Sequence, residues 1–583
     1  MVYCGKPSRG CQMCRTRRIK CDETKPTCNQ CAKSRRQCPG YKDEFDIIFR
    51  NETKATERRA QKANQKAGTR KVEQVHDPAA IHALRNSQAQ NHVIVMPQVP
   101  LDQQASCHFV TNFVLVPRQD WSRGYMEFLP ALLKSNPSAI HFKYAFEACS
   151  LASLGNRSGP GQDFAEKAVG LYTKALAATH VALKDPTLAT HDTTLAAVLL
   201  MGLYENMTAS QMGTLSWGSH IEGAIEIAKA RGQKQMRTKL GRQLFIAVRG
   251  QVIIHTISTG KAPAMGADWW SIDSVSNSHA ATCQKLNLRT GELRAEVTRL
   301  MMTVPRTPDN IEVILNLMRR CQTVDQELVH WMAHLPDEFH YKTAAWEDNV
   351  PNGDYSKAEV YPGRVDAYQD LWIASIWNMG RCARIILSSL IVRCAAWVCS
   401  PVDYRTTPEY ATAARTCGEM ITDVIASVPF QLGWFITRTH LLERVNIATS
   451  ACGDESSCKG VLGYWLTWPL TVVNGQDFTT DSQRAWAKGR LEFIGTHVGV
   501  KYATMLAELK LRIPSMLIRK DGLMAAPYQN PANFVDILNG KTAPPHSVER
   551  QNSPPQATHS HSPPQHILPG SGSRFYAKVP QSA

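Results

Sequence analysis

The hydrophobic residues of this chain recur at helical spacing over most of its length, from about Cys107 to Pro514. Between residues 165 and 183, apolar or small side chains stand three and four positions apart, and the pattern stops before Pro186. Such spacing places them on one face of an amphipathic helix that ends near the proline. Alternating patterns and hairpin turns are scarce, so the sequence predicts one large all-α domain over residues 106–514.

Two stretches within this region are too apolar for a helix on the protein surface. The segment TLAAVLLMGLYE is apolar nearly all round, which predicts a central helix with Asp192 as its cap. The stretch ARIILSSLIVRCAAWVCS is the strongest candidate for a membrane span, but Arg384 and Arg393 interrupt it. Because a charged residue at the bilayer centre is costly, a helix in the protein core is the better interpretation.

Three other segments lack this pattern. Residues 1–40 have almost no apolar side chains beyond Met13 and Ile19, so they cannot bury a hydrophobic core. Residues 41–105 are polar and basic without a heptad repeat, which indicates a linker with no recognisable zipper. Residues 515–583 are rich in Pro, Ser, Gln and His and are expected to be a disordered tail.

The basic charge is concentrated near the N-terminus. The 583 residues carry a formal charge of +16, of which +12 lies between Met1 and Lys71. The remaining 512 residues carry only +4, so an anionic partner is expected at the N-terminus alone, with nucleic acid as the natural candidate. The segment after Met1 has no apolar stretch typical of a secretion signal, so the cysteines are expected to stay reduced.

Six cysteines in the first 38 residues form a repeat. The half-motif C-x2-C-x6-C occurs twice, seventeen residues apart, as Cys11, Cys14, Cys21 and as Cys28, Cys31, Cys38. Six thiolates complete two tetrahedral zinc sites only where two sulfurs bridge, because two such sites need eight bonds.

Cys11 and Cys28 open the two halves of the repeat, so they are the expected bridges. One zinc ion would then be completed by Cys14 and Cys21, and the other by Cys31 and Cys38. A redox CxxC pair and an iron–sulfur cluster are the alternatives. The first would not repeat with a six-residue arm, and the second would leave cysteines over.

A short basic run follows each C-x2-C pair, at residues 15–20 and 33–36, and each run is expected to be a short helix. The cysteine pattern resembles the fungal binuclear zinc cluster, Zn2Cys6, transcription factors. The resemblance implies that the first helix enters the major groove of DNA and reads a CGG-type triplet, a role that falls by position to Arg17 and Arg18. Arg15 and Lys20 are expected to contact phosphate. A zinc cluster that only holds a protein surface together would leave these basic runs without a purpose.

Several phrases of the helical region also resemble the regulatory region of these factors, called the middle homology or fungal-specific transcription factor region. They are AFEACSLASLGNR, WGSHIEGAIEIAKARG, DLWIASIWNMGRCARIIL and RLEFIGTHVGVKYATMLA. Small residues allow helices to approach closely, and Trp217, Trp372 and Trp377 are expected to fill the spaces between them. This resemblance supports an architecture and not a chemical activity.

No arrangement of residues predicts catalysis. His220 and Glu222 stand two positions apart and therefore lie on different faces of a helix. His330 and His334 share a helix face, but the sequence has no HExxH motif, and His255 is interpreted as a structural histidine. Phosphate-loop, dinucleotide-binding and nucleophile-elbow motifs are absent from the sequence, so we expect no enzymatic activity.

These features predict a nuclear, sequence-specific DNA-binding transcription factor of RNA polymerase II promoters that holds two Zn2+ ions. Its expected partners are double-stranded DNA and the transcription machinery; a homodimer is compatible with the family, and no membrane is involved. The resemblance implies control of a metabolic or secondary-metabolite pathway. The alternative is a small-molecule-sensing or partner-binding helical regulator in which the zinc cluster is only an adaptor.

Overall fold

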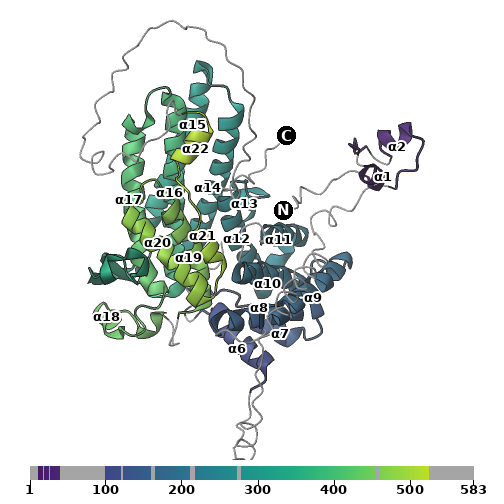
Figure 1. Cartoon of the computed structure of the whole chain (residues 1–583), viewed down its shortest axis with the longest axis horizontal. Coiled ribbons are helices and arrows are strands. Elements are labelled where there is room, and N and C mark those ends of the chain that lie inside the picture. The colour runs from purple at the N-terminus through teal and green to yellow at the C-terminus, as the bar shows by residue number, and fades with distance from the viewer. Residues whose placement is uncertain are drawn as a thin grey trace, which may run out of the picture. The chain divides into compact units, whose positions relative to one another are not determined.

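The structure is a computed structural model of the chain. It describes residues 11–17, 19–24, 27–39, 99–117, 119, 122–158, 164–209, 217–271, 278–452 and 458–523. Most of the linker expected at 41–105, and the part of the expected tail beyond residue 523, lie outside these residues. Within these residues, a cysteine-rich N-terminal segment is followed by a largely helical remainder, so the predicted fold class is confirmed (Figure 1).

The α-helices of the first part of the chain are α1 (Gln12–Thr16), α2 (Asn29–Lys33), α6 (Leu101–Phe113), α7 (Leu129–Ser135), α8 (Ile140–Arg157), α9 (Phe164–Lys184), α10 (Asp192–Thr208), α11 (Trp217–Arg231) and α12 (Lys239–Thr259). Those that follow are α13 (Gly266–Trp269), α14 (Ser278–Thr303), α15 (Ile311–Ala333), α16 (Leu371–Cys399), α17 (Pro408–Gln431), α18 (Thr439–Arg444), α19 (Gly460–Gly475), α20 (Asp481–Phe493), α21 (Tyr502–Ala507) and α22 (Ser515–Lys520).

The helical part is divided into two compact units, whereas the hydrophobic pattern of the sequence predicted one domain. The first unit contains α6 to α11 and the start of α12 as far as Val248, and the second unit runs mainly from Arg249 onward. The division falls inside α12, where the helical pattern of the sequence is continuous. The helical domain was expected to span residues 106–514. Helix α6 begins before this range, and α22 lies after it.

The first unit is built around α8 and α10. Helix α8 packs against α6, α9 and α10, and these helices lie side by side in Figure 1. Every residue of α10 from Thr193 to Met207 is buried, as the all-round apolar pattern predicted. Helix α9 buries Ala168, Tyr172 and Ala175, which stand three and four positions apart, so the amphipathic interpretation of this segment is correct.

The second unit is built around α16, which packs against α14, α15, α17 and α19 (Figure 1). This helix is long and apolar enough to cross a membrane, but 72% of its most apolar window is buried inside the protein. Two of its three arginines interrupt the apolar stretch, and both are paired with acids: Arg384 Nε lies 2.8 Å from Asp325 Oδ1, and Arg393 Nε lies 2.6 Å from Asp521 Oδ2. Helix α16 is therefore a core helix.

The strands in the described part of the chain form one antiparallel pair in the second unit. Strand β1 (Lys342–Glu347) pairs with β2 (Gly363–Ala367), and the register runs from Lys342 opposite Ala367 to Glu347 opposite Gly363, with an irregularity between Thr343 and Ala345. Short 3-10 helices connect several of the longer elements, such as η1 (Gly232–Arg237), which lies between α11 and α12.

Candidate metal centre and nucleic-acid interface

The two halves of the cysteine repeat fold in the same way. In each half the first cysteine precedes a five-residue helix and the second lies inside it. The Cys14 backbone N–H donates to Cys11 Sγ at 3.4 Å, and the Cys31 backbone N–H donates to Cys28 Sγ at 3.3 Å. The first sulfur of each half therefore serves as the N-cap acceptor of its helix.

The position of the helices differs from the prediction. The basic runs at 15–20 and 33–36 were expected to be helical, but α1 ends at Thr16 and α2 ends at Lys33. Each helix instead encloses the C-x2-C pair, because the capping sulfur fixes the helix start at the first cysteine. Most of each basic run therefore follows its helix.

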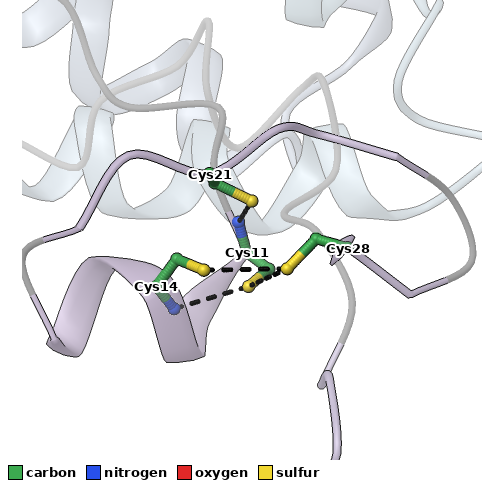
Figure 2. A group of neighbouring side chains, drawn as sticks. All are labelled: Cys11, Cys14, Cys21 and Cys28. Carbon is green, nitrogen blue, oxygen red and sulfur yellow. Dashed lines mark hydrogen bonds between the residues drawn. The ribbon is translucent and has the colours of Figure 1, made fainter. Parts of the chain in front are cut away.

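The six sulfurs form two groups of four. One group is Cys11, Cys14, Cys21 and Cys28, and the other is Cys11, Cys28, Cys31 and Cys38; within each group the sulfurs lie within 4.8 Å of one another. Cys11 Sγ is 3.7 Å from the Sγ atoms of both Cys28 and Cys31, and Cys14 Sγ is 3.6 Å from Cys28 Sγ. Figure 2 shows the sulfurs of the first group turned toward one another.

These distances fit tetrahedral zinc. Zinc–sulfur bonds of about 2.3 Å at tetrahedral angles place the sulfurs of one site about 3.8 Å apart. Disulfides require sulfurs about 2 Å apart, and all six cysteines are free. The donor set of thiols alone, in fours, is the chemistry of a structural zinc site.

The electrostatics of this segment also fit a bound cation. Cys11, Cys14, Cys28 and Cys31 have no more than 1% of their surface exposed, and the packing around them consists of Met13 and the other two cysteines. Burial raises the pKa of Cys14 and Cys28 and raises that of Cys31 to about 12. Such thiols ionise only where a cation stabilises the thiolates, and without one the segment has almost no apolar core.

Asp22 holds the second half in place, a role that the cysteine pattern of the sequence did not predict. Its carboxylate accepts hydrogen bonds from the backbone N–H groups of Asn29 at 3.1 Å and Gln30 at 3.4 Å. Backbone N–H groups at the start of a helix such as α2 have no acceptor within the helix, and Asp22 supplies one. The Thr24 hydroxyl donates to the same carboxylate, and these bonds hold the pKa of Asp22 at about 2. An acidic residue a few positions before a short helix was the available signal.

The four predicted DNA-contacting residues are described to different extents. Arg17 and Lys20 are exposed, and Arg17 Nη1 donates to Ser34 Oγ at 3.4 Å, which links the two halves. Arg15 lies in α1, but the structure does not describe its side chain, and Arg18 lies outside the described residues. Lys33, Arg35 and Arg36 of the second half are also exposed.

Comparison with known proteins decides what this cluster is. Residues 9–46 match the fungal Zn(2)-Cys(6) binuclear cluster domain, and residues 107–271 match the fungal specific transcription factor domain. The chain is a Zn2Cys6 fungal transcription factor. Its six clustered cysteines bind two zinc ions, and the family implies DNA binding and action in the nucleus.

Individual relatives agree with this assignment. Transcription factor dbaG of Emericella nidulans is 22% identical over 419 residues, which cover 71% of this factor and 93% of the relative. The lysine biosynthesis regulatory protein LYS14 of Saccharomyces cerevisiae is 69% identical over 29 residues, 5% of this factor and 4% of the relative. The aspercryptin biosynthesis cluster-specific transcription regulator atnN of Emericella nidulans is 49% identical over 37 residues, 6% of each chain. No solved structure matches the factor.

The histidines of the helical part have structural surroundings. Tyr172 donates its hydroxyl proton to Glu205 Oε1 at 2.7 Å, so the contact of 2.9 Å between Tyr172 Oη and His220 Nε2 requires the histidine to donate. His220 and His255 are buried, whereas His330 and His334 are exposed and stack on each other at the C-terminal end of α15. The factor belongs to a transcription factor family and is not an enzyme.

The three tryptophans expected to fill the helical packing are buried. Trp217, Trp372 and Trp377 have between 5% and 7% of their surface exposed. Trp377 Nε1 also donates to the carbonyl of Phe339 at 2.7 Å, which satisfies its polar atom inside the second unit.

Proposed function

We propose that the factor recognises CGG-type triplets at RNA polymerase II promoters, with α1 in the major groove. Arg17 and Arg18 read base edges, and Arg15 and Lys20 contact phosphates. Support comes from the cluster, which presents basic side chains such as Arg17 and Lys20 to solvent directly after α1. Guanidinium groups suit this task because they donate to both acceptors of guanine at once.

Arg18→Ala and Lys20→Ala test this assignment as a matched pair. Arg18→Ala should lower the discrimination between CGG and single-base variants by about 5- to 150-fold, which corresponds to one lost bidentate contact. Lys20→Ala should weaken binding to all sequences alike and flatten the dependence of log K on log salt by about 0.9. Fluorescence anisotropy on a panel of duplexes measures both, and an unchanged base preference in Arg18→Ala would remove this residue from base reading.

The zinc ions are held, in this proposal, by Cys11 and Cys28 as bridging ligands. Cys14 and Cys21 complete one site, and Cys31 and Cys38 complete the other. The observation that supports this is that Cys11 and Cys28 belong to both groups of four sulfurs. No other cysteine of the described residues does so.

Zinc stoichiometry tests the bridges. Cys28→Ala should leave neither site with four ligands and should lose both zinc ions, whereas Cys38→Ala leaves one complete site and should retain one ion per chain. Metal analysis of the purified full-length variants measures the difference. Equal zinc content in the two variants would contradict the assignment of Cys28.

The pathway under control is proposed to be metabolic, with residues 106–514 as the regulatory domain and residues 1–40 as the DNA-binding domain. Two relatives that share the cluster are named as regulators of lysine biosynthesis and of aspercryptin biosynthesis. Genome-wide occupancy of the tagged factor, combined with expression after deletion of its gene, tests this. Occupied promoters outside metabolic gene sets would contradict the proposal.

A second candidate function is the sensing of a small molecule by the second unit. A small hollow of about 60 Å3 is lined by Trp468, Thr471, Gln476, Leu511 and other mainly apolar residues. The Ser389 hydroxyl donates its proton to the backbone carbonyl of Ile385, so Gln476 Nε2 must be the donor in its hydrogen bond to Ser389 Oγ. The other amide atom, Gln476 Oε1, is buried without a hydrogen-bond partner. Thermal stabilisation of the factor by hydroxylated apolar compounds, lost in Gln476→Met, would support sensing, and a screen without stabilisation would not.

A further inference from the structure

A second concentration of positive charge lies outside the cysteine segment. Between Lys229 and Arg242 the sequence has six basic residues and no acidic one. This segment of fourteen residues therefore carries +6, whereas everything after Lys71 carries +4 in total. The expectation that an anionic partner should be sought at the N-terminus alone overlooked this segment.

This segment folds into a tight turn between two helices, and a buried side chain holds the turn in place. Helix α11 ends at Arg231, η1 follows, and α12 begins at Lys239. Gln235 is buried, and its Nε2 donates to the carbonyls of Ala228 at 3.0 Å and Gly232 at 2.8 Å. The turn is therefore held in one conformation by a buried amide.

The start of α12 is fixed in the same way. The Gly241 backbone N–H donates to Thr238 Oγ1 at 2.9 Å, which caps the helix. A side chain at Gly241 would collide with the backbone carbonyl of Gln235, so only glycine fits there. Four exposed cations project from this fixed turn: Lys234, Arg237, Lys239 and Arg242. We call these four residues the basic turn.

The charges of the basic turn are not neutralised within the part of the first unit that the structure describes. Arg231 pairs with Asp192, and Lys229 lies 3.6 Å from Glu226, so the neighbouring acids are already used. None of the four residues of the basic turn has an ion pair with a described residue; Arg242 Nη1 donates to the neutral carbonyl of Met236 at 3.0 Å.

Two of these cations also stand where a helix disfavours them. Lys239 and Arg242 lie in the first turn of α12, which contains no acidic residue. Positive charge at a helix N-terminus is repelled by the helix dipole, so this arrangement does not serve the stability of the helix. Such departures from local preference are expected where a partner supplies the missing charge.

We propose that the basic turn binds the sugar–phosphate backbone of duplex DNA without reading sequence. Residues 218–244 contain no Phe, Trp or Tyr, so the surface has phosphate-binding side chains but no aromatic platform for unpaired bases. DNA is favoured over an acidic protein because the family implies that the zinc cluster of the same chain binds DNA. The chain from Cys38 to Val99 cannot exceed about 210 Å, so DNA bound by the cluster is present at a high effective concentration.

Salt dependence of DNA binding by the full-length, zinc-loaded factor tests this proposal. The probes are a duplex of 16 base pairs and one of 60 base pairs, neither containing CGG, and the variant is Lys234→Gln, Arg237→Gln, Lys239→Gln, Arg242→Gln. Four lost phosphate contacts should flatten the slope of log K against log salt by up to about 3.6 on the long duplex. Between 50 and 200 mM salt, the wild type should then lose up to about 150-fold more affinity than the variant.

A matched control separates this surface from net charge. Lys134, Lys167, Lys174 and Lys184 are also exposed in the first unit, and their replacement by Gln removes the same charge. The control should keep the wild-type slope. Equal slopes for the basic-turn variant and the wild type on the long duplex, or equal flattening in the control, would overturn the proposal. Tight binding of the wild type to polyglutamate with unchanged DNA slopes would overturn it in favour of an acidic protein partner.

This experiment is independent of the triplet-reading proposal. The duplexes contain no CGG, and circular dichroism of both variants verifies their folding. A loss of triplet preference in Arg18→Ala therefore has no bearing on the slope difference, and the reverse also holds.

Discussion

The pair of Arg393 and Asp521 provides the most demanding test of how the second unit is held together. Only 3% of the Arg393 side chain and 5% of the Asp521 side chain are exposed. Two hydrogen bonds, of 2.6 and 2.7 Å, join the guanidinium to the carboxylate, and Arg393 Nη1 also donates to Thr298 Oγ1 at 3.1 Å. Asp521→Asn leaves the buried guanidinium without a countercharge, which should cost about 3 to 5 kcal/mol of unfolding free energy.

The double variant Arg393→Met, Asp521→Leu gives the opposite expectation. Because it removes both charges together, no uncompensated charge remains in the core, and its stability should lie near or above that of the wild type. The control is Glu312→Gln, which removes the exposed partner of Arg319 and should change stability by less than about 1 kcal/mol.

Urea unfolding followed by tryptophan fluorescence measures these differences. Eleven of the thirteen tryptophans lie between residues 249 and 523, so the signal reports mainly on the second unit. With an m-value of about 3 kcal/mol/M, Asp521→Asn should lower the midpoint by about 1 to 1.7 M. A single variant as stable as the double variant would refute the reasoning, because the penalty would then not arise from an unpaired buried charge.

Three further predictions concern other parts of the factor. Gly489→Ala should destabilise the second unit by about 2 to 3 kcal/mol in urea unfolding, because its new methyl group would meet the Ser356 backbone, whereas Gly170→Ala, with open space in α9, should stabilise by about 0.5 to 1 kcal/mol. Burial lowers the pKa of His220 to about 4, so the unfolded state binds the proton more readily and stability should fall by up to about 3 kcal/mol as the pH drops from about 6.5 to 4. His220→Gln should remove this loss, which circular dichroism melts across that pH range would reveal. Removal of zinc by a chelator should unfold the cysteine segment and abolish the preference for CGG-type sites, while leaving the far-ultraviolet signal of the helical units nearly unchanged.

The sequence predicted those features that depend on local spacing. The all-round apolar pattern of α10 and the long apolar stretch of α16 are properties of a few helical turns, and both helices are buried as expected. The zinc ligands were also predictable, because the number of bonds around zinc is fixed and the cysteines that supply them lie within 28 residues.

Features that depend on distant partners were not predictable in this way. The tail was expected to begin at residue 515, yet α22 follows and Asp521 pairs with Arg393, 128 residues earlier in the sequence. Composition alone gives no sign of that contact. The division into two units was equally hidden, since it falls inside the continuous helix α12.

The basic turn shows why a charge count along the chain is an incomplete guide to a binding surface. Averaged over the helical region, its cations are offset by acids elsewhere, and the net charge is unremarkable. In the folded chain, the acids nearest to the turn are occupied by Arg231 and Lys229, and a buried Gln235 fixes the backbone that carries the remaining cations. Whether a charge is available to a partner thus depends on which neighbours it has after folding. For this factor, the affinity for DNA is therefore expected to depend on two surfaces, one organised by zinc and the other by a single buried amide.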